Sequence, residues 1–253
     1  MRAKNKMIKK VEYADALSPF HATVFGCRIL STAAAYGLNE PFAQFWMQEG
    51  TDTVLCMLDD TVILDAGKAD YEELKDFIRM TGAARLLCDS SVARKIGFQV
   101  TAGGQIMVYD NVEPVQEKPN FEINPSLRDV HALLSACASE TFTPPEFEPF
   151  YMDMSHRIRH DTAMAVGMRQ ADRLVSCAIC STQTKEKAIL SAVCVDPAFR
   201  RKGLGHVTLS AIISQLPGKK IFVMRAQNEN EAFYRSFGFA ECGEFSELQI
   251  QGV

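Results

Sequence analysis

The chain has 253 residues, of which 47% are hydrophobic and 23% charged, and its formal net charge is -4 at pH 7. This length and apolar content suit two ordinary globular domains or one large domain with a packed core. The slightly acidic balance argues against a general nucleic-acid binder, so we expect small-molecule chemistry and no nucleic-acid partner. No apolar run could span a bilayer and no signal-peptide region follows the basic opening, so we expect no membrane partner and a cytoplasmic location.

Eight cysteines are scattered through apolar stretches, which favours reduced core residues over a disulfide framework. Cys177 and Cys180 have the spacing of a redox or zinc pair, but their odd spacing places the two thiols on opposite faces of a strand. Buried structural cysteines are therefore the favoured interpretation, and no metal site is predicted. An oxidoreductase acting through this pair is a competing hypothesis that requires a titratable dithiol.

The first half of the chain predicts a small mixed sheet. Residues 53–58 and 61–64 flank Asp59-Asp60 as a hairpin, and a strand at 82–88, a short helix ending at Ile96 and a strand at 105–109 follow. Residues 111–125 contain three prolines among polar residues, which is typical of an extended connector. We therefore predict a domain boundary near residue 118, which divides the chain into residues 1–117 and 118–253.

The second half predicts hairpins followed by a strand–helix–strand crossover. The expected strands are at 121–123, 163–168, 174–182, 188–195, 220–225 and 247–250, and the expected helices are at 126–138, 146–159, 206–216 and 230–237. This order makes an α/β chain with a mixed sheet and helices on its faces. The end of the first half repeats part of the same order, so we interpret it as a related fold.

A basic glycine loop, Arg200-Arg201-Lys202-Gly203-Leu204-Gly205, joins the strand at 188–195 to the next helix. The first N–H groups of a helix have no internal partner and its dipole favours negative charge, so this loop is a candidate anion site. Glycines let a diphosphate approach the backbone closely. A solvated surface loop is the alternative. The spacing fits neither a Walker A loop nor a dinucleotide fingerprint.

One further pattern carries a family resemblance. The run Val193-Cys194-Val195-Asp196-Pro197-Ala198-Phe199 leads into the basic glycine loop, and Phe233-Tyr234-Arg235-Ser236-Phe237-Gly238-Phe239 follows later. Together they resemble the GNAT superfamily of acyl-CoA-dependent N-acetyltransferases, over residues 121–250. The resemblance implies tandem GNAT-like domains, each a mostly antiparallel mixed sheet with helices on both faces. The N-terminal half lacks the loop and is interpreted as a degenerate GNAT-like domain.

The resemblance implies that acetyl-CoA is the co-substrate and binds along the strand at 189–195. Its pantetheine amides are expected to pair near Val193 and Val195, and its pyrophosphate to bind the N–H groups of residues 201–206. The sheet is expected to splay beyond Val195, and the amine to enter beside the helices within 126–159. The implied cofactor-binding residues are Val193, Cys194, Val195, Arg200, Arg201, Lys202, Gly203, Leu204, Gly205, His206 and Asn228.

Tyr234 matches the family's tyrosine ahead of the closing Gly-Phe, which implies a general acid for the CoA sulfur. A core tyrosine is the alternative. Many family members carry a glutamate early in the central strand, but Ile189, Leu190 and Ser191 occupy that region here, so the general base is unassigned. Candidate bases are Glu140, Glu146, Glu148, Asp153, His156 and His160. For the two histidines, a solvated basic helix face is favoured over a metal site.

The sequence therefore predicts an N-acetyltransferase that moves an acetyl group from acetyl-CoA to a primary amine by direct attack. The acceptor is expected to be a small-molecule or peptide amine, which the sequence does not identify. A non-catalytic acyl-CoA-binding sensor or structural protein is the alternative, and the missing strand glutamate favours it. The oligomeric state, including a homodimer, is left open.

Overall fold

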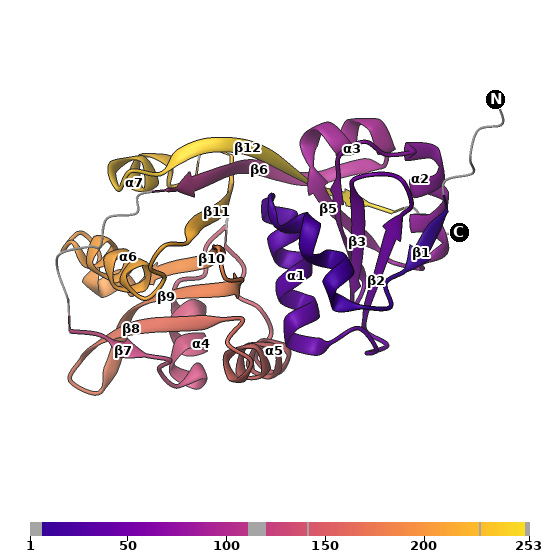
Figure 1. The fold of residues 1–253 in the computed structure, drawn as a ribbon. Helices are drawn as coiled ribbons and strands as arrows, with labels where there is room; N and C mark the ends of the chain where they lie inside the picture. The colour runs from indigo at the N-terminus through magenta and orange to yellow at the C-terminus, as the bar shows by residue number, and fades with distance from the viewer. Residues whose placement is uncertain (1–6, 111–119, 141, 228, 251–253) are drawn as a thin grey trace, which may run out of the picture. The chain divides into compact units, whose positions relative to one another are not determined.

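The computed structural model describes residues 7–110, 120–140, 142–227 and 229–250 (Figure 1). The chain forms two compact units, and neither is a single continuous piece of sequence. Unit 1 comprises the described residues of 1–107, 224–231 and 241–253, and unit 2 comprises those of 108–223 and 232–240. The predicted boundary near residue 118 lies outside the described residues and stays a prediction.

Unit 1 is built on a mixed sheet. Its strands follow the order β1-β2-β3-β4-β5-β12, with β6 beside β12. Only the β4–β5 pair is parallel among the five pairings from β1 to β12. Its elements are β1 (Ile8–Lys10), a 3-10 helix (Ala14–His21), α1 (Val24–Tyr36), β2 (Ala43–Gln48), β3 (Thr53–Leu58), β4 (Thr61–Ala66), α2 (Tyr71–Met80), β5 (Arg85–Asp89), α3 (Ser90–Ile96), β6 (Gln99–Tyr109) and β12 (Ala240–Gln249).

Alternation along the strands of unit 1 divides its core into two layers. Val62 and Leu64 pack with α2 and α3 in one apolar cluster, to which Leu248 of β12 also contributes. Ile63 points to the opposite face because successive strand residues alternate. Asp65 shares the face of Ile63, and its carboxylate lies against Gly26 of α1, so α1 covers this second face (Figure 1).

Two glycines let β6 pass close to its neighbours in unit 1. A Cβ on Gly104 would lie 1.9 Å from the backbone oxygen of Arg225, and one on Gly103 would lie 2.8 Å from the backbone oxygen of Phe245. Arg225 itself is buried, and its guanidinium pairs with Glu231 at 3.1 Å and with Glu241 at 3.3 Å. The close backbone contacts hold β6 against β12 and against the segment at Arg225. The Arg225 guanidinium adds ion pairs with two glutamates.

The strands of unit 2 follow the order β11-β10-β9-β8-β7 and are also of mixed direction. The β10–β11 pair is parallel, and the pairs β10–β9, β9–β8 and β8–β7 are antiparallel. Its elements are β7 (Glu122–Ile123), α4 (Leu127–Ala136), α5 (Phe147–Arg159), β8 (Met164–Gln170), β9 (Arg173–Gln183), β10 (Lys187–Val195), a 3-10 turn (Pro197–Phe199), α6 (Leu204–Ser214), β11 (Lys220–Ala226) and α7 (Glu231–Ser236).

The helices of unit 2 cover both faces of its sheet (Figure 1). Helices α4 and α5 pack in one apolar cluster with Cys177 of β9. The neighbouring Ser176 points to the opposite face, where its hydroxyl lies 2.7 Å from the Thr208 hydroxyl of α6. The two faces therefore separate α4 and α5 from α6.

The predicted fold class is confirmed, because the chain is a mixed α/β structure with mostly antiparallel strands. In unit 2 the predicted helices and strands are found within about two residues of their expected ends, the usual uncertainty of such boundaries. The last strand is longer than the predicted 247–250, and it pairs with β5 of unit 1. Among the described residues, no helix combines the length and apolar character needed to cross a membrane.

Asp65 is a partly buried carboxyl group in unit 1. Burial raises the pKa of Asp65 from its ordinary value of 3.8 to about 6, while a hydrogen bond from Thr23 lowers it and the charge of Asp89 raises it. The folded state therefore binds this proton more tightly than the unfolded chain does. Stability from protonated Asp65 is full below about pH 3.8 and is lost as the pH rises through about pH 6.

We expect Asp65→Asn to raise the free energy of unfolding by about 2 kcal/mol at pH 7 and to change it little near pH 4, because the amide carries no charge to bury. Urea unfolding followed by the fluorescence of Trp46, the single tryptophan and a residue of β2 in unit 1, measures this. Asp15→Asn, at an exposed aspartate of the same unit, is the control. An equal gain at both pH values would contradict the prediction.

Candidate functional site

The basic glycine loop of unit 2 begins from a buried carboxylate. Asp196 is 2% exposed, and its side chain accepts the N–H of Ala198 at 2.9 Å and pairs with Arg173 of β9. Arg201 and Gly203 then take positive φ angles of 63° and 78°. The chain is thereby turned from the end of β10 into the first turn of α6, and Arg200, Arg201 and Lys202 are left exposed around the turn.

The N-terminus of α6 presents unused backbone donors. The N–H of His206 donates to the carbonyl of Gly203 at 3.0 Å, so it is already engaged. The N–H groups of Leu204 and Gly205 donate to no acceptor within the described ranges of the chain. A Cβ on Gly205 would lie 3.3 Å from the ring of Phe233, so this glycine lets α7 approach the helix start. The arrangement can bind an anion at the free donors.

The His206 side chain is used in packing against α7. Its ring meets Phe233 edge-on with centroids 5.1 Å apart, and its Nε2 lies 3.2 Å from the hydroxyl of Ser236. Lys202, in turn, has its ammonium 5.0 Å from the ring of Phe199. The structure thus brings the predicted loop residues together but gives His206 a supporting contact with α7.

Strand β10 continues past the point where β11 leaves it. The parallel pairing runs from Lys187 to Leu190 and ends there, although β10 itself reaches Val195. The sheet therefore splays at Leu190, earlier than the predicted point beyond Val195. A register shift on the β9 side, between Leu190 and Ala192, marks a bulge at the same place, and bulges bend the strand that carries them.

The free edge of β10 consists of the backbone groups of Val193 and Val195. The N–H of Asp196 donates to Val175 of β9, and the groups that face a partner alternate along an antiparallel strand. Val193 and Val195 therefore direct their backbone groups away from β9. The carbonyl of Val195 accepts from Arg200 Nε at 3.1 Å and from the Cys137 thiol at 3.4 Å. Val193 offers both of its backbone groups to a ligand.

Tyr234 lies on α7, packed edge-on against Phe233 and Phe239 with ring centroids 5.1 and 5.4 Å away. Burial raises the pKa of Tyr234 to about 12, and negative charge on Cys194 raises it as well. The electrostatic link places the phenol in the neighbourhood of the free edge of β10. The phenol stays protonated throughout the neutral range and can act as a proton donor there.

One protein-family model matches the C-terminal part of the chain. A family model described as an acetyltransferase (GNAT) domain matches residues 131–250, which include the loop, β10 and Tyr234. Residues 131–250 are thus similar to a GNAT acetyltransferase domain. No curated protein sequence matches it.

Solved structures extend this likeness to the whole chain. A Drosophila protein has a TM-score of 0.65 at 16% identity and covers 96% of this chain and 98% of its own. A tandem GNAT protein from the clavulanic acid biosynthesis pathway has a TM-score of 0.61 at 11% identity, covering 98% and 99%. A GCN5-related N-acetyltransferase from Sphaerobacter thermophilus has a TM-score of 0.57 at 13% identity, covering 100% and 98%. The fold is thus the two-domain GNAT form.

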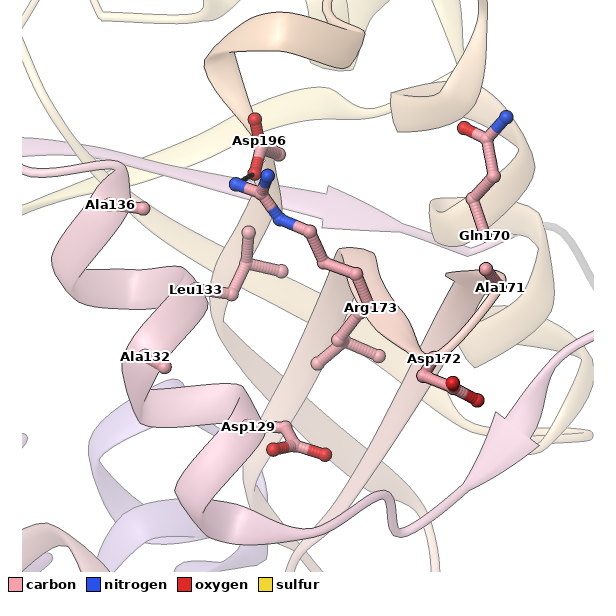
Figure 2. Close-up of a pocket in the computed structure, with 10 residues that line it drawn as sticks. Asp129, Ala132, Leu133, Ala136, Gln170, Ala171, Asp172, Arg173 and Asp196 are labelled. Carbon is pink, nitrogen blue, oxygen red and sulfur yellow. Dashed lines mark hydrogen bonds and ion pairs between the residues drawn. The ribbon is translucent and has the colours of Figure 1, made fainter.

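A cavity of about 570 Å³ opens in the GNAT domain between α4 and the β8–β9 hairpin (Figure 2). It extends to the ion pair of Arg173 with Asp196, at the end of β10 that carries the basic loop. Asp129, which also lines it, is paired with Arg169 at 2.6 Å. The cavity is on the α4 face, the side from which the amine is expected. Its lining residues are Asp129, Ala132, Leu133, Ala136, Gln170, Ala171, Asp172, Arg173, Leu174 and Asp196.

The candidate bases of the GNAT domain are not drawn into one site. Asp153 pairs with the buried Arg157 at 2.7 Å. His156 and His160 stack on each other with centroids 4.2 Å apart, and within the described ranges no group of histidine, cysteine and acidic residues is arranged to hold a metal ion. Glu140, Glu146 and Glu148 are exposed. The base therefore stays unassigned, and Asn228 lies outside the described residues.

Sequence reasoning missed two features of this site. The partner of Asp196 is Arg173, which lies on another strand, and the thiol beside Cys194 belongs to Cys177, the residue opposite it on β9. Only the register of the β9–β10 hairpin could have found these pairs. An Asp directly before Pro197 is, however, a recognisable capping signal for the turn that follows.

We expect Asp196→Ala to lower the free energy of unfolding by about 1 to 2 kcal/mol, because the turn loses its cap and Arg173 loses its buried partner. Asp196→Asn should lose less, since its amide oxygen can still accept the N–H of Ala198. Urea unfolding measures both variants. Asp172→Ala, at an aspartate that lines the same cavity, is the matched control. A loss in Asp172→Ala as large as that in Asp196→Ala would refute the assignment.

Proposed function

We propose that this protein transfers an acetyl group from acetyl-CoA to a primary amine by direct attack. The observation that carries the proposal is the free edge of β10, which the basic glycine loop joins to the open N-terminus of α6. An elongated ligand with amide groups followed by a diphosphate matches this sequence of donors and acceptors. A cytoplasmic location is proposed with it, because all eight cysteines are reduced and seven of them are buried.

The residues present fit acetyl-CoA. We assign its pantetheine amides to the backbone groups of Val193 and Val195, and its diphosphate to the N–H groups of Leu204 and Gly205. Arg201 and Lys202 are exposed at the loop and add positive charge there. Arg200 is assigned a supporting role, because its guanidinium already holds the carbonyl of Val195. The remaining assigned residues Cys194, Gly203 and His206 shape the strand, the turn and the contact with α7. Asn228, which lies outside the described residues, stays a predicted cofactor-binding residue.

Acetyl-CoA supplies an activated thioester, and the chain supplies the groups that orient it. The N–H of Val193 is the proposed donor to the thioester oxygen, where negative charge develops during attack. Tyr234 is the proposed general acid for the departing sulfur. Its pKa of about 12 exceeds the ordinary thiol value of about 8.5, so the proposed proton transfer requires that the leaving thiolate be desolvated too, which would raise the pKa of the thiol.

The amine acceptor is proposed to reach the thioester from the face of α4 and α5, where the cavity of Figure 2 opens. The acceptor is a small-molecule or peptide amine, and a homodimer is compatible with the proposal. A second candidate function is an acyl-CoA-binding sensor without turnover. The observation that favours it is Ile189, an apolar residue 4% exposed where many family members carry a glutamate.

Calorimetric titration of acetyl-CoA into the purified protein tests the cofactor site. We expect micromolar binding, weakened at least about 100-fold in the Gly203→Glu, Gly205→Glu double variant, because carboxylates then occupy the anion site.

The matched control is Gly218→Glu, since Gly218 also has a positive φ, 71°, with open space around its Cβ position. It should bind acetyl-CoA as the wild type does. If the double variant binds acetyl-CoA as tightly as the wild type, the assignment of the diphosphate to this loop is refuted. Absence of binding by a folded wild-type protein would end both the catalytic and the sensor hypotheses.

Tyr234→Phe should lower kcat with any accepted amine by about 100-fold while changing the Kd for acetyl-CoA less than about threefold, since only a proton donor is lost. An amine panel with thiol detection identifies the acceptor first.

Because the pKa of Tyr234 is about 12, its ionisation should cause no fall in kcat below about pH 10. Tyr151→Phe, at an exposed tyrosine of α5, is the control. Full activity in Tyr234→Phe would make this residue a core tyrosine, and wild-type binding without turnover would favour the sensor.

A further inference from the structure

Three thiols from three separate elements meet at the end of β10. Cys137 follows the last turn of α4, Cys177 lies on β9 and Cys194 lies on β10, and all three belong to one apolar cluster. They are 7%, 0% and 9% exposed. Cys180, which the sequence spacing pairs with Cys177, lies outside this cluster, and its thiol donates to the backbone oxygen of Thr182. The proximate thiols are therefore not the pair that sequence spacing indicates.

Cys177 and Cys194 are directly opposite each other in the β9–β10 pairing. The N–H of Asp196 donates to Val175, so alternation makes Cys177 and Cys194 a hydrogen-bonded pair, whose Cα atoms are typically about 5.5 Å apart. This separation lies within the range that a disulfide spans, about 4.4 to 6.8 Å. Cys137 is held differently, because its thiol donates to the carbonyl of Val195.

The three thiols are electrostatically unequal. A hydrogen bond from Cys177 lowers the pKa of Cys194 against the opposing effect of burial, and Cys137 and Arg200 lower it further. The pKa of Cys177 is raised well above its ordinary value by its hydrogen bond to Cys194 and by burial. Cys194 is thus the thiol most able to become a nucleophilic thiolate, and Cys177 keeps its proton beside it.

We propose that Cys194 is a site of oxidation by hydrogen peroxide and that Cys177 resolves it to an intramolecular disulfide. In the first step the Cys194 sulfur attacks the O–O bond, an S–O bond forms, and water leaves, which gives a sulfenic acid. In the second step the Cys177 sulfur displaces the hydroxyl group, the S–S bond forms, and a second water carries away the Cys177 proton. Two thiols are oxidised and one peroxide is reduced.

The burial of Cys194 selects the oxidant. A thiol that is 9% exposed admits a molecule such as hydrogen peroxide more readily than a bulky disulfide. The new bond would join β9 to β10 next to Val193 and Val195. This consequence rests on the proposed function: because those residues form the proposed acetyl-CoA edge, oxidation is expected to weaken acetyl-CoA binding at least about tenfold.

Hydrogen peroxide treatment of the full chain, followed by alkylation and non-reducing peptide mapping, tests the proposal. A Cys242→Ser background removes the exposed cysteine and with it disulfides between chains. We expect one Cys177–Cys194 disulfide, reversed by dithiothreitol. Cys177→Ala should leave a sulfenic acid on Cys194 that dimedone captures, and the matched control Cys180→Ala should form the disulfide as the parent does.

Wild-type protein supplies a result that does not depend on the folding of variants. If peroxide oxidises the exposed Cys242 while Cys194 is recovered as an unmodified thiol, the site is refuted. A disulfide between Cys137 and Cys194 would also overturn the assignment of Cys177. Calorimetry on oxidised and reduced protein separates the two proposals. Equal acetyl-CoA affinity in both states would refute the effect on the edge, and no binding by reduced protein would refute the proposed function while the mapped disulfide stands.

Discussion

The parting of β10 from β11 after Leu190 is the constraint on which the site depends. A strand that loses its neighbour leaves backbone donors and acceptors without partners, and such groups are costly when they are buried dry. Here the basic glycine loop joins the unpaired stretch to the open first turn of α6. Unsatisfied backbone groups thus lie at both ends of one loop, and a ligand that pairs with both sets would gain amide hydrogen bonds and charge stabilisation together.

The loop at the end of this stretch gets its shape from short-range interactions. Asp196 caps the turn two residues ahead, and Gly203 supplies a backbone conformation that other residues rarely adopt. Such features depend on residues near each other in sequence. That is why the loop, the strand before it and the helix after it were predictable from the sequence, along with most elements of unit 2.

Long-range strand pairings could not be predicted from the sequence, because they join residues that are far apart along the chain. The alternation of side chains along β10 does not reveal that its parallel pairing with β11 ends at Leu190. The length of that pairing depends on the path of β11, which is a separate segment of the chain. Nor does the sequence of β12 show that it pairs with β5, which lies more than half the chain away. Each compact unit also combines segments that are far apart in the sequence, which local patterns do not reveal. The thiol contact of Cys194 with Cys177 depends on register, which a slip of one residue would abolish.

The proposed acid and the proposed oxidation site share one electrostatic environment. Negative charge on Cys194 raises the pKa of Tyr234, so a thiolate at Cys194 helps to keep the phenol protonated. A disulfide with Cys177 would remove that charge, and with it this contribution to the pKa of Tyr234. Burial would still hold the pKa above its ordinary value, because burial is the larger cause. Oxidation should therefore act on this site through the geometry of β10 more than through the protonation of Tyr234.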